Sequence, residues 1–165
     1  MIDQDSIKKE FISWLENFVE VPNSKLGGWP PCPYARQARM TNKIELLFSK
    51  IENLHKDVHD SLQLLESKDV VVICFDHTTI NGTDLQEFVA TMNLELMERN
   101  YVILEDHPDV FEYINGVKMN FNLCGLLVIS ELNKLNDASL KIGANGYYDH
   151  WSKSNIDDVV SWRFR

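Results

Sequence analysis

The sequence predicts a single-domain α/β sandwich over residues 1–165, with a mostly parallel or mixed sheet of about four or five strands. Short apolar runs rich in β-branched residues alternate with longer segments whose apolar residues recur every three or four positions. No repeat, low-complexity tract or interdomain linker interrupts this pattern, and the length suits one hydrophobic core. A ferredoxin-like variant and a small doubly wound sheet both fit the alternation.

The first predicted element is an amphipathic helix over residues 6–19, with Ser6 available as its N-cap. A stretch rich in proline and glycine follows at residues 22–33, where so many breakers predict irregular structure. A second, shorter helix is expected to start at Pro33, because proline suits the first position of a helix.

The middle of the chain carries the clearest alternation of strands and helices. The run at residues 70–75 is continuously apolar, as a strand covered on both faces would be. Strands that alternate with helices of this length imply right-handed crossovers and a largely parallel core. In chain order, a strand, a helix, a strand, a helix and a strand are predicted at residues 44–48, 51–66, 70–75, 84–99 and 101–104.

After Pro108 the pattern supports two interpretations. Asn115-Gly116 is a dipeptide typical of a hairpin turn between two short strands. The same stretch also fits one helical turn that Pro108 opens and Gly116 closes. The remaining predicted elements are a strand and two helices at residues 126–129, 131–142 and 156–162.

Composition narrows the classes of partner and the compartment. The net charge is −9 and no basic stripe offsets it, which argues against a nucleic-acid partner because such binding draws on Lys and Arg at phosphates. No apolar run is long enough to span a bilayer, and the N-terminus lacks the features of a signal peptide. We therefore expect a soluble cytoplasmic protein without a membrane partner, and its oligomeric state stays open.

The three cysteines are an odd and widely spaced set that does not resemble a disulfide framework or a structural zinc motif. Cys74 and Cys124 lie within apolar runs, which predicts two core residues. Reduced thiols in a reducing compartment are therefore expected at Cys32, Cys74 and Cys124.

Two acid–histidine pairs provide the main candidate site. Asp76-His77 and Asp106-His107 each follow an apolar run, and parallel strands would bring both pairs to the sheet edge where α/β proteins hold ligands. Neighbours on an extended strand point to opposite faces, so a contact from Asp106 to His77 across the strands is more useful than one within a pair. The alternative is that these residues simply begin loops, as Asp and His commonly do.

Cys32 is the third candidate, because it lies where the irregular stretch meets a predicted helix start. Backbone N–H groups and the helix dipole would stabilise a thiolate there. Arg36, one turn further on, would strengthen that effect or hold an anionic substrate. The alternative is that Cys32 packs as a small buried hydrophobe.

Together these motifs resemble an uncharacterised family of small bacterial proteins that is known only as a domain of unknown function. Members of that family carry Cys-Pro-Phe-Ala after an N-terminal helix and two later strands that each end near His-Pro. Here Cys32-Pro33-Tyr34-Ala35 matches with Tyr for Phe, Asp106-His107-Pro108 matches well, and Thr78 replaces the proline after His77. The resemblance covers residues 11–108. It implies a site at Cys32, His77 and His107 but no chemistry.

The leading functional hypothesis is a small-molecule enzyme or ligand-binding protein, and the sequence does not decide between the two. Its pocket is expected to gather Cys32, Arg36, Asp76, His77, Asp106 and His107. In one version His77, His107 and either Cys32 or Asp106 ligate a transition metal such as Zn or Fe. In the other, Cys32 is a nucleophile, a histidine is its base and Arg36 clamps an anion.

The alternative is a non-catalytic interaction module without an active site. In that case the acid–histidine pairs begin loops, and exposed aromatic side chains contact a protein partner or a second subunit. The aromatic residues in question are Trp29, Tyr147, Tyr148, Trp151 and Trp162.

Overall fold

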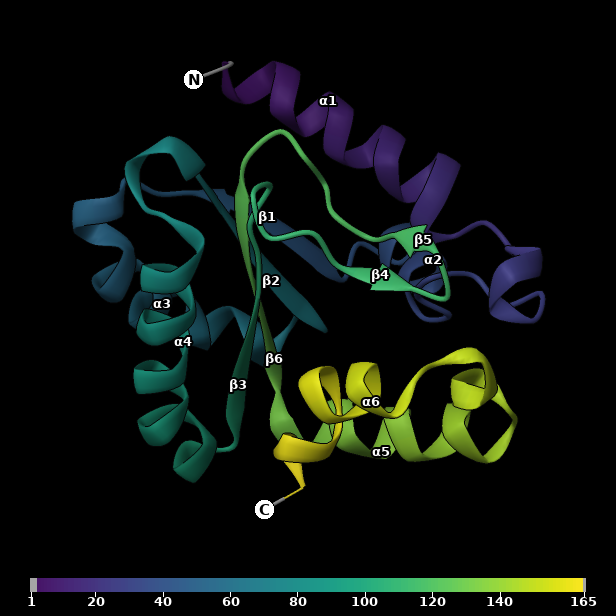
Figure 1. The fold of residues 1–165 in the computed structure, drawn as a ribbon. Coiled ribbons are helices and arrows are strands. Elements are labelled where there is room, and N and C mark those ends of the chain that lie inside the picture. Colours follow the sequence, from purple (N-terminus) through teal and green to yellow (C-terminus); the bar gives the residue numbers. More distant parts are fainter. Residues whose placement is uncertain (1–2, 165) are drawn as a thin grey trace.

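The computed structural model describes residues 3–164, which form a four-stranded mixed sheet packed with helices and a separate two-stranded hairpin (Figure 1). The strands of the sheet lie in the order β1-β2-β6-β3. This arrangement confirms the predicted α/β class, in its mixed-sheet form. The strand bounds are Ile44–Phe48 for β1, Val70–Phe75 for β2, Tyr101–Asp106 for β3 and Gly125–Glu131 for β6.

Strand β6 lies between β2 and β3 and runs antiparallel to both, whereas β1 and β2 are parallel. The strands β2 and β3 therefore point the same way, and their carboxyl ends meet at one edge of the sheet as predicted. The helices α3 (Leu54–Ser61) and α4 (Gly82–Leu96) connect β1 to β2 and β2 to β3. Both pack on the same face because the chain advances in one direction across the sheet through right-handed crossovers.

The sheet has a buried core on each face, which is why β2 is apolar at every position. On one face Val71, Ile73 and Phe75 pack against α3 and α4. On the other, Val72 and Cys74 pack against the N-terminal helix and Phe121. The continuous apolar run of β2 thus reflects burial on both sides, as the sequence predicted.

The N-terminal helix α1 (Gln4–Trp14) continues as a π-helical turn through Val19, in agreement with the predicted segment. The predicted N-cap, Ser6, is wrong: the N-cap is Asp3. The Asp3 carboxylate accepts hydrogen bonds from the backbone N–H and the hydroxyl of Ser6 at 3.0 and 2.6 Å. The second helix, α2 (Ala35–Met40), begins two residues after Pro33.

The central helices extend over the predicted ranges through short 3₁₀ turns at their ends. Such turns are common where a helix tightens at its terminus. They lie at Ile51–Asn53 and Leu62–Glu66 around α3, and at Met97–Arg99 after α4.

The segment after Pro108 forms the hairpin and not the helical turn. Strands β4 (Tyr113–Ile114) and β5 (Val117–Lys118) pair around Asn115 and Gly116, whose φ angles are 47° and 80°. Two consecutive positive φ angles define the tight turn that Asn-Gly favours. Of the two interpretations, the hairpin is confirmed.

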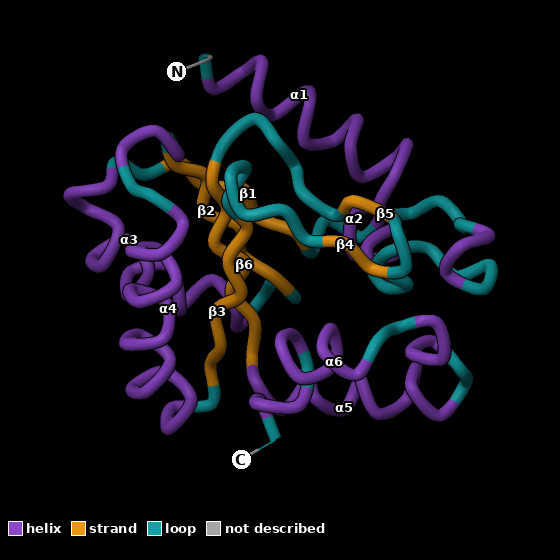
Figure 2. The backbone as a smooth tube through the Cα atoms, viewed as in Figure 1, coloured by secondary structure: helices purple, strands orange, loops and turns teal. Residues whose placement is uncertain are grey.

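The segment after β6 is helical, as predicted, and lies beneath the hairpin on the side of the sheet away from α3 and α4 (Figure 2). It comprises α5 (Leu132–Ala144), a 3₁₀ turn at Tyr147–His150, α6 (Lys153–Val159) and a last 3₁₀ turn at Ser161–Arg163. Within residues 3–164, no helix is long and apolar enough to cross a membrane.

A disulfide joins Cys74 in β2 to Cys124 just before β6, with Cα atoms 6.2 Å apart. The expectation of three reduced thiols is therefore wrong for these two residues, and only Cys32 is free. The disulfide could not be predicted from local patterns, because the two cysteines are 50 residues apart and meet only when β6 inserts beside β2. Both belong to the core between α1 and the sheet, so the predicted burial is correct.

We expect unreduced, denatured protein to react with a maleimide at one thiol per chain, at Cys32, and fully reduced protein at all three cysteines. Reduction removes a cross-link that closes a 50-residue separation, which should lower the free energy of unfolding by about 4 kcal/mol. Cys32→Ser should abolish labelling before reduction. Three reactive thiols without reductant would contradict the disulfide.

Candidate functional site

The two predicted histidines do come together at the carboxyl ends of β2 and β3. The rings of His77 and His107 lie edge to face with centroids 5.7 Å apart. His77 begins a 3₁₀ turn after β2, and His107 follows β3 directly. The prediction that these two side chains share one edge of the sheet is confirmed by this geometry.

His107 is nevertheless fully engaged with the backbone. It is 2% exposed, and its Nε2 lies 2.8 Å from the carbonyl oxygen of Ile80 and 3.2 Å from that of His77. Its Nδ1 lies 3.1 Å from the backbone nitrogen of Asp109. Carbonyl oxygens only accept and an N–H only donates, so these partners fit a neutral ring with the proton on Nε2. His107 thus ties the loop after β2 to the loop after β3.

The two aspartates beside the histidines stabilise loops and contact neither imidazole by a hydrogen bond. The Asp76 carboxylate accepts hydrogen bonds from the backbone N–H and hydroxyl of Thr78 at 3.0 and 2.7 Å, and these bonds lower its pKa. The Asp106 carboxylate accepts from Asn120 Nδ2 at 2.6 Å and from the backbone N–H of Phe121 at 2.9 Å. Burial raises the pKa of Asp106 despite these bonds. The proposed contact from Asp106 to His77 is therefore not made.

Cys32 lies elsewhere, before α2 and beside the C-terminal region. Its backbone N–H donates to the carbonyl of Val19 at 3.1 Å, and the Tyr147 hydroxyl donates to the carbonyl of the preceding Pro31. The residue is exposed, yet atoms packed around its sulfur raise the pKa of the thiol, and the backbone N–H groups of Tyr34 and Ala35 offset this only in part. This environment favours the thiol and not the thiolate that the sequence predicted.

Arg36 is exposed on α2 and forms no ion pair with any of residues 3–164. Its neighbour Arg39 instead makes the strong pair, with two hydrogen bonds of 2.7 and 2.9 Å to the Glu20 carboxylate. Nothing in the contacts of Cys32 or Arg36 brings either residue to His77 and His107.

The residues predicted to ligate a metal ion do not all come together in the structure. Among residues 3–164, no three side chains of His, Cys, Asp or Glu come close enough to hold a metal ion. His77 and His107 remain a pair, and both nitrogens of His107 already have backbone partners. The described part of the chain therefore does not support a Zn or Fe site at His77, His107 and Cys32.

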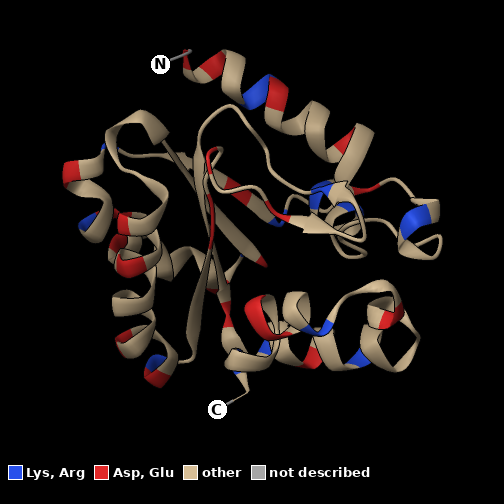
Figure 3. Cartoon of the chain, viewed as in Figure 1, with Lys and Arg blue, Asp and Glu red and all other residues tan. Residues whose placement is uncertain are grey.

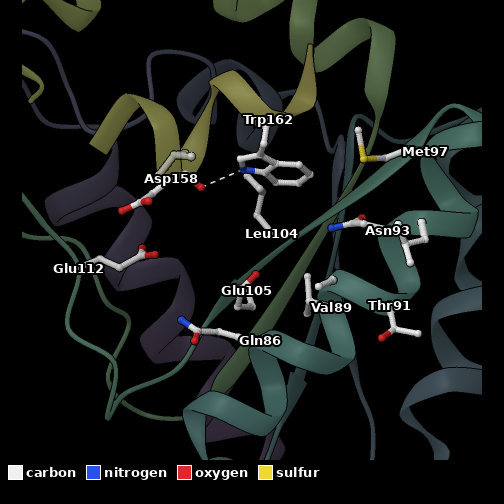
Figure 4. A pocket seen from close by; sticks show the side chains of 13 residues that line it. Gln86, Val89, Thr91, Asn93, Met97, Leu104, Glu105, Glu112, Asp158 and Trp162 are labelled. Atoms are coloured by element: carbon white, nitrogen blue, oxygen red, sulfur yellow. Dashed lines mark hydrogen bonds between the residues drawn. The ribbon is translucent and has the colours of Figure 1, made fainter. Parts of the chain in front are cut away.

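A cavity of about 450 Å³ lies instead along the free edge of β3 (Figure 4). Helix α4 forms one wall, and the C-terminal segment with Asp158 and Trp162 forms the opposite wall. The loop that carries Glu112 completes it. The lining residues are Gln86, Val89, Ala90, Thr91, Asn93, Leu94, Met97, Leu104, Glu105, Glu112, Asp158, Val159 and Trp162.

The cavity has an acidic side and an apolar side. Glu105, Glu112 and Asp158 line it, and no hydrogen bond or ion pair to another of residues 3–164 engages their carboxylates. Atoms packed around its carboxyl group and the nearby charges of Asp106, Glu105 and Asp158 raise the pKa of Glu112 to about 7, although the residue as a whole is exposed. Burial also raises the pKa of Glu105. The site thus holds several carboxylates at close quarters without a cation.

The apolar side is built on Trp162, whose position is fixed. Its indole Nε1–H donates to the backbone carbonyl of Asp158 at 2.9 Å, as the dashed line in Figure 4 shows. The ring faces Leu104 across the cavity, with Met97 and Val89 along the α4 wall. A flat or aliphatic group of modest size would find apolar contacts here.

The edge of β3 gives the cavity polar backbone groups as well. The amide of Asn93 pairs with Ile103 through both its atoms, accepting from the backbone N–H at 2.9 Å and donating to the carbonyl at 3.0 Å. Ile103 therefore turns its backbone groups toward the free edge. Because such groups alternate along an antiparallel strand, those of Glu105 face the same edge, next to the cavity.

The aromatic residues considered for partner contacts pack mostly on one another. Tyr147 is buried and its ring centroid lies 5.6 Å from Trp29, 4.8 Å from Tyr148 and 5.7 Å from Trp151. This cluster fastens the loop before α2 to the C-terminal region. Trp162 is the member of the set that lines the cavity.

No family model, curated protein or solved structure matches the chain. The resemblance to the bacterial family of unknown function stays a prediction. The candidate site therefore rests on the cavity along β3 and the contacts of its lining residues.

Sequence reasoning did not find the cavity as a site, because its residues come from four separate segments. Glu105 stands in the acidic strand end that the sequence singled out, next to Asp106. Trp162 was considered only as an aromatic contact to a partner, and Glu112 and Asp158 carry no local signal that distinguishes them from ordinary surface residues. Only the closure of the C-terminal helices over β3 brings them together.

We expect His107→Ala to lower the free energy of unfolding by about 3 kcal/mol, because it leaves buried backbone groups without partners and opens a small void. His77→Ala is the matched control, since that ring is only partly buried, and should cost less than about 1 kcal/mol. Chemical denaturation measures both variants. Equal losses would contradict the structural role of His107.

We expect Glu112→Gln to stabilise the protein above neutral pH. The folded-state pKa of about 7 exceeds the ordinary value of 4.5, so the folded protein binds this proton more tightly than the unfolded chain does. The free energy of unfolding therefore falls as the pH rises between these values, and the penalty persists above them. With a discount for partial exposure, the variant should gain about 1 kcal/mol near pH 8 and nothing near pH 4. A gain of equal size at both pH values would contradict the raised pKa.

Proposed function

We propose that the protein binds a small organic molecule in the cavity along β3. The observation that carries this proposal is the composition of one open cavity, in which an indole and aliphatic walls face carboxylates that make no hydrogen bond or ion pair to another of residues 3–164. Ligand sites commonly combine an apolar lining with a few polar groups that fix orientation. A volume of about 450 Å³ lies at the small end of such sites and suits a metabolite-sized ligand.

Two side chains that line the cavity are held in one orientation by hydrogen bonds to the backbone. Asn93 is buried and bonded to Ile103, and Trp162 donates to the Asp158 carbonyl. Both contacts are made within the protein, so little ordering is left for binding to impose. Preorganisation of this kind supports recognition by the cavity as it stands.

The proposal keeps the small-molecule hypothesis and moves its location. The sheet edge that carries His77 and His107 lies next to the cavity, because Glu105 and Asp106 are consecutive residues. The Asp106 side chain contacts Asn120, and the Glu105 side chain lines the cavity. The set of Cys32, Arg36 and the two histidines does not form a common pocket in the contacts described above. Binding, and not nucleophilic catalysis by Cys32, is therefore the function that this geometry supports best.

The compartment in which the protein resides can be tested through its disulfide. The sequence predicts the cytoplasm, whereas disulfides persist mainly in oxidising compartments. Thiol counting on protein quenched directly from its producing cells separates these alternatives, because an oxidised pair of Cys74 and Cys124 favours an oxidising environment.

Two-dimensional NMR with a panel of aromatic fragments that carry amine, alcohol or carboxylate groups tests the proposal. We expect at least one fragment to shift the indole N–H signal of Trp162 together with the amide signals of Val89 and Asn93. Ala90→Trp on the cavity wall should abolish these shifts, because the indole fills the space.

The matched control is Thr83→Trp, which adds the same side chain to an exposed position of α4 outside the cavity lining. It should leave the fragment shifts unchanged. Fragments that bind equally well to the Ala90→Trp variant, or a panel with no binder, would refute the cavity as a ligand site.

A further inference from the structure

We infer that the ligand of this cavity is an organic cation, a primary amine attached to a compact apolar body. The inference rests on the proposed function and specifies its substrate class. It comes from the distribution of charge around one space: Glu105, Glu112 and Asp158 line the acidic side, and the indole of Trp162 lines the other (Figure 4).

Among residues 3–164, no ion pair engages the carboxylates of Glu105, Glu112 or Asp158. Asp106 adds its negative charge from behind the strand end and contributes to the raised pKa of Glu112. Lys118 is the cation on the neighbouring hairpin: its charge acts on Asp106, and its ammonium lies over the ring of Phe111, 4.2 Å from the centroid. Lysines and arginines are otherwise interspersed with acidic residues over the molecule and do not gather at this edge (Figure 3).

Arg163, next to Trp162, is turned away from the acidic side. Its guanidinium is buried and donates to the Ser139 hydroxyl at 2.9 Å and to the Val159 carbonyl at 3.1 Å. It is therefore held between α5 and α6 and does not neutralise Glu105 or Glu112. A bound ammonium would supply the charge that the cavity lacks.

The geometry favours an ammonium over a metal ion. No three acidic, histidine or cysteine side chains among residues 3–164 converge on one point, as a metal ion would require. The carboxylates are instead spread along one side of a space of about 450 Å³. A primary ammonium needs only one of these carboxylates as its direct partner, and the indole adds cation–π attraction.

The apolar half of the cavity explains why the cation should be organic. Leu104, Met97 and Val89 offer no hydrogen-bond partners from their side chains and form a wall opposite Trp162. Transfer of an apolar group from water to this wall is favourable, whereas a small hydrated cation would gain nothing from it. The ligand thus needs both ends: a charged amine and a hydrophobic body.

Calorimetric titration with three probes of one shape tests the inference: 3-phenylpropylamine, 3-phenylpropan-1-ol and 3-phenylpropanoate. We expect the amine to bind at least about tenfold more tightly than the alcohol, and the acid not to bind, since one charge-assisted hydrogen bond is worth that factor. Glu112→Gln should weaken amine binding about tenfold and leave alcohol binding within about twofold. Glu87→Gln, which removes a charge from α4 outside this cavity, is the matched control and should change neither.

The pH dependence gives a second readout. Ionisation of Glu112, whose pKa is about 7, precedes its pairing with an ammonium, so amine affinity should rise from pH 6 to about pH 8 while alcohol affinity stays constant. If amine and alcohol bind with equal affinity and both are lost in Ala90→Trp, the cavity binds ligands but the cation inference is overturned. If none of the probes binds and the fragment panel also fails, the proposed function falls with it.

Discussion

The insertion of β6 between β2 and β3 is the constraint on which the rest of the structure depends. It runs antiparallel to both neighbours and satisfies the inner edges of both strands at once. The insertion requires close contact at its first residue: Gly125 lies opposite Phe75, and a Cβ at that position would meet the Phe75 ring at 2.3 Å. A glycine at this position therefore lets β6 enter where two parallel strands end.

In the order β1-β2-β6-β3, β3 is an edge strand, and the cavity follows from that position. An edge strand leaves backbone N–H and C=O groups without a strand partner, which costs free energy if they are buried. At Ile103 the buried amide of Asn93 replaces the missing strand. Two residues further along β3, at Glu105, no side-chain amide takes this role among the described residues. The C-terminal segment does not fill the space beside this part of the edge, and the cavity lies there.

The same insertion explains why the two histidines meet without forming the expected site. With β6 between them, β2 and β3 are two strand spacings apart, about 10 Å. The loops after the strands close this distance, and His107 is the side chain that fastens them through Ile80 and Asp109. A buried ring with both nitrogens bonded to backbone holds the loops together. Asn120 extends this network to Asp106 and Glu112 and thereby positions the carboxylate at the cavity.

The sequence predicted those features that depend on neighbours along the chain. The strand at residues 44–48, the strand at residues 70–75 and the Asn-Gly hairpin follow from periodicity and turn chemistry, and all three lie where predicted. The predicted N-cap and the predicted reduced thiols were wrong for different reasons. Asp3 and Ser6 both suit the cap, so the local pattern does not choose between them. Cys124 reaches Cys74 only through the strand order, which local periodicity does not encode.

The carboxylates at the cavity are informative because they are unfavourable for the folded protein alone. A buried or crowded carboxylate is ordinarily paired, as Glu20 is with Arg39 here. Glu112 has no such partner among the described residues, and its raised pKa records the resulting free-energy cost. The chain has a net charge of −9, so its solubility does not depend on Glu105, Glu112 and Asp158 facing one cavity. Local arrangements that lower stability without a structural return are typical of sites shaped by function, and this supports the proposal that the cavity binds an organic cation.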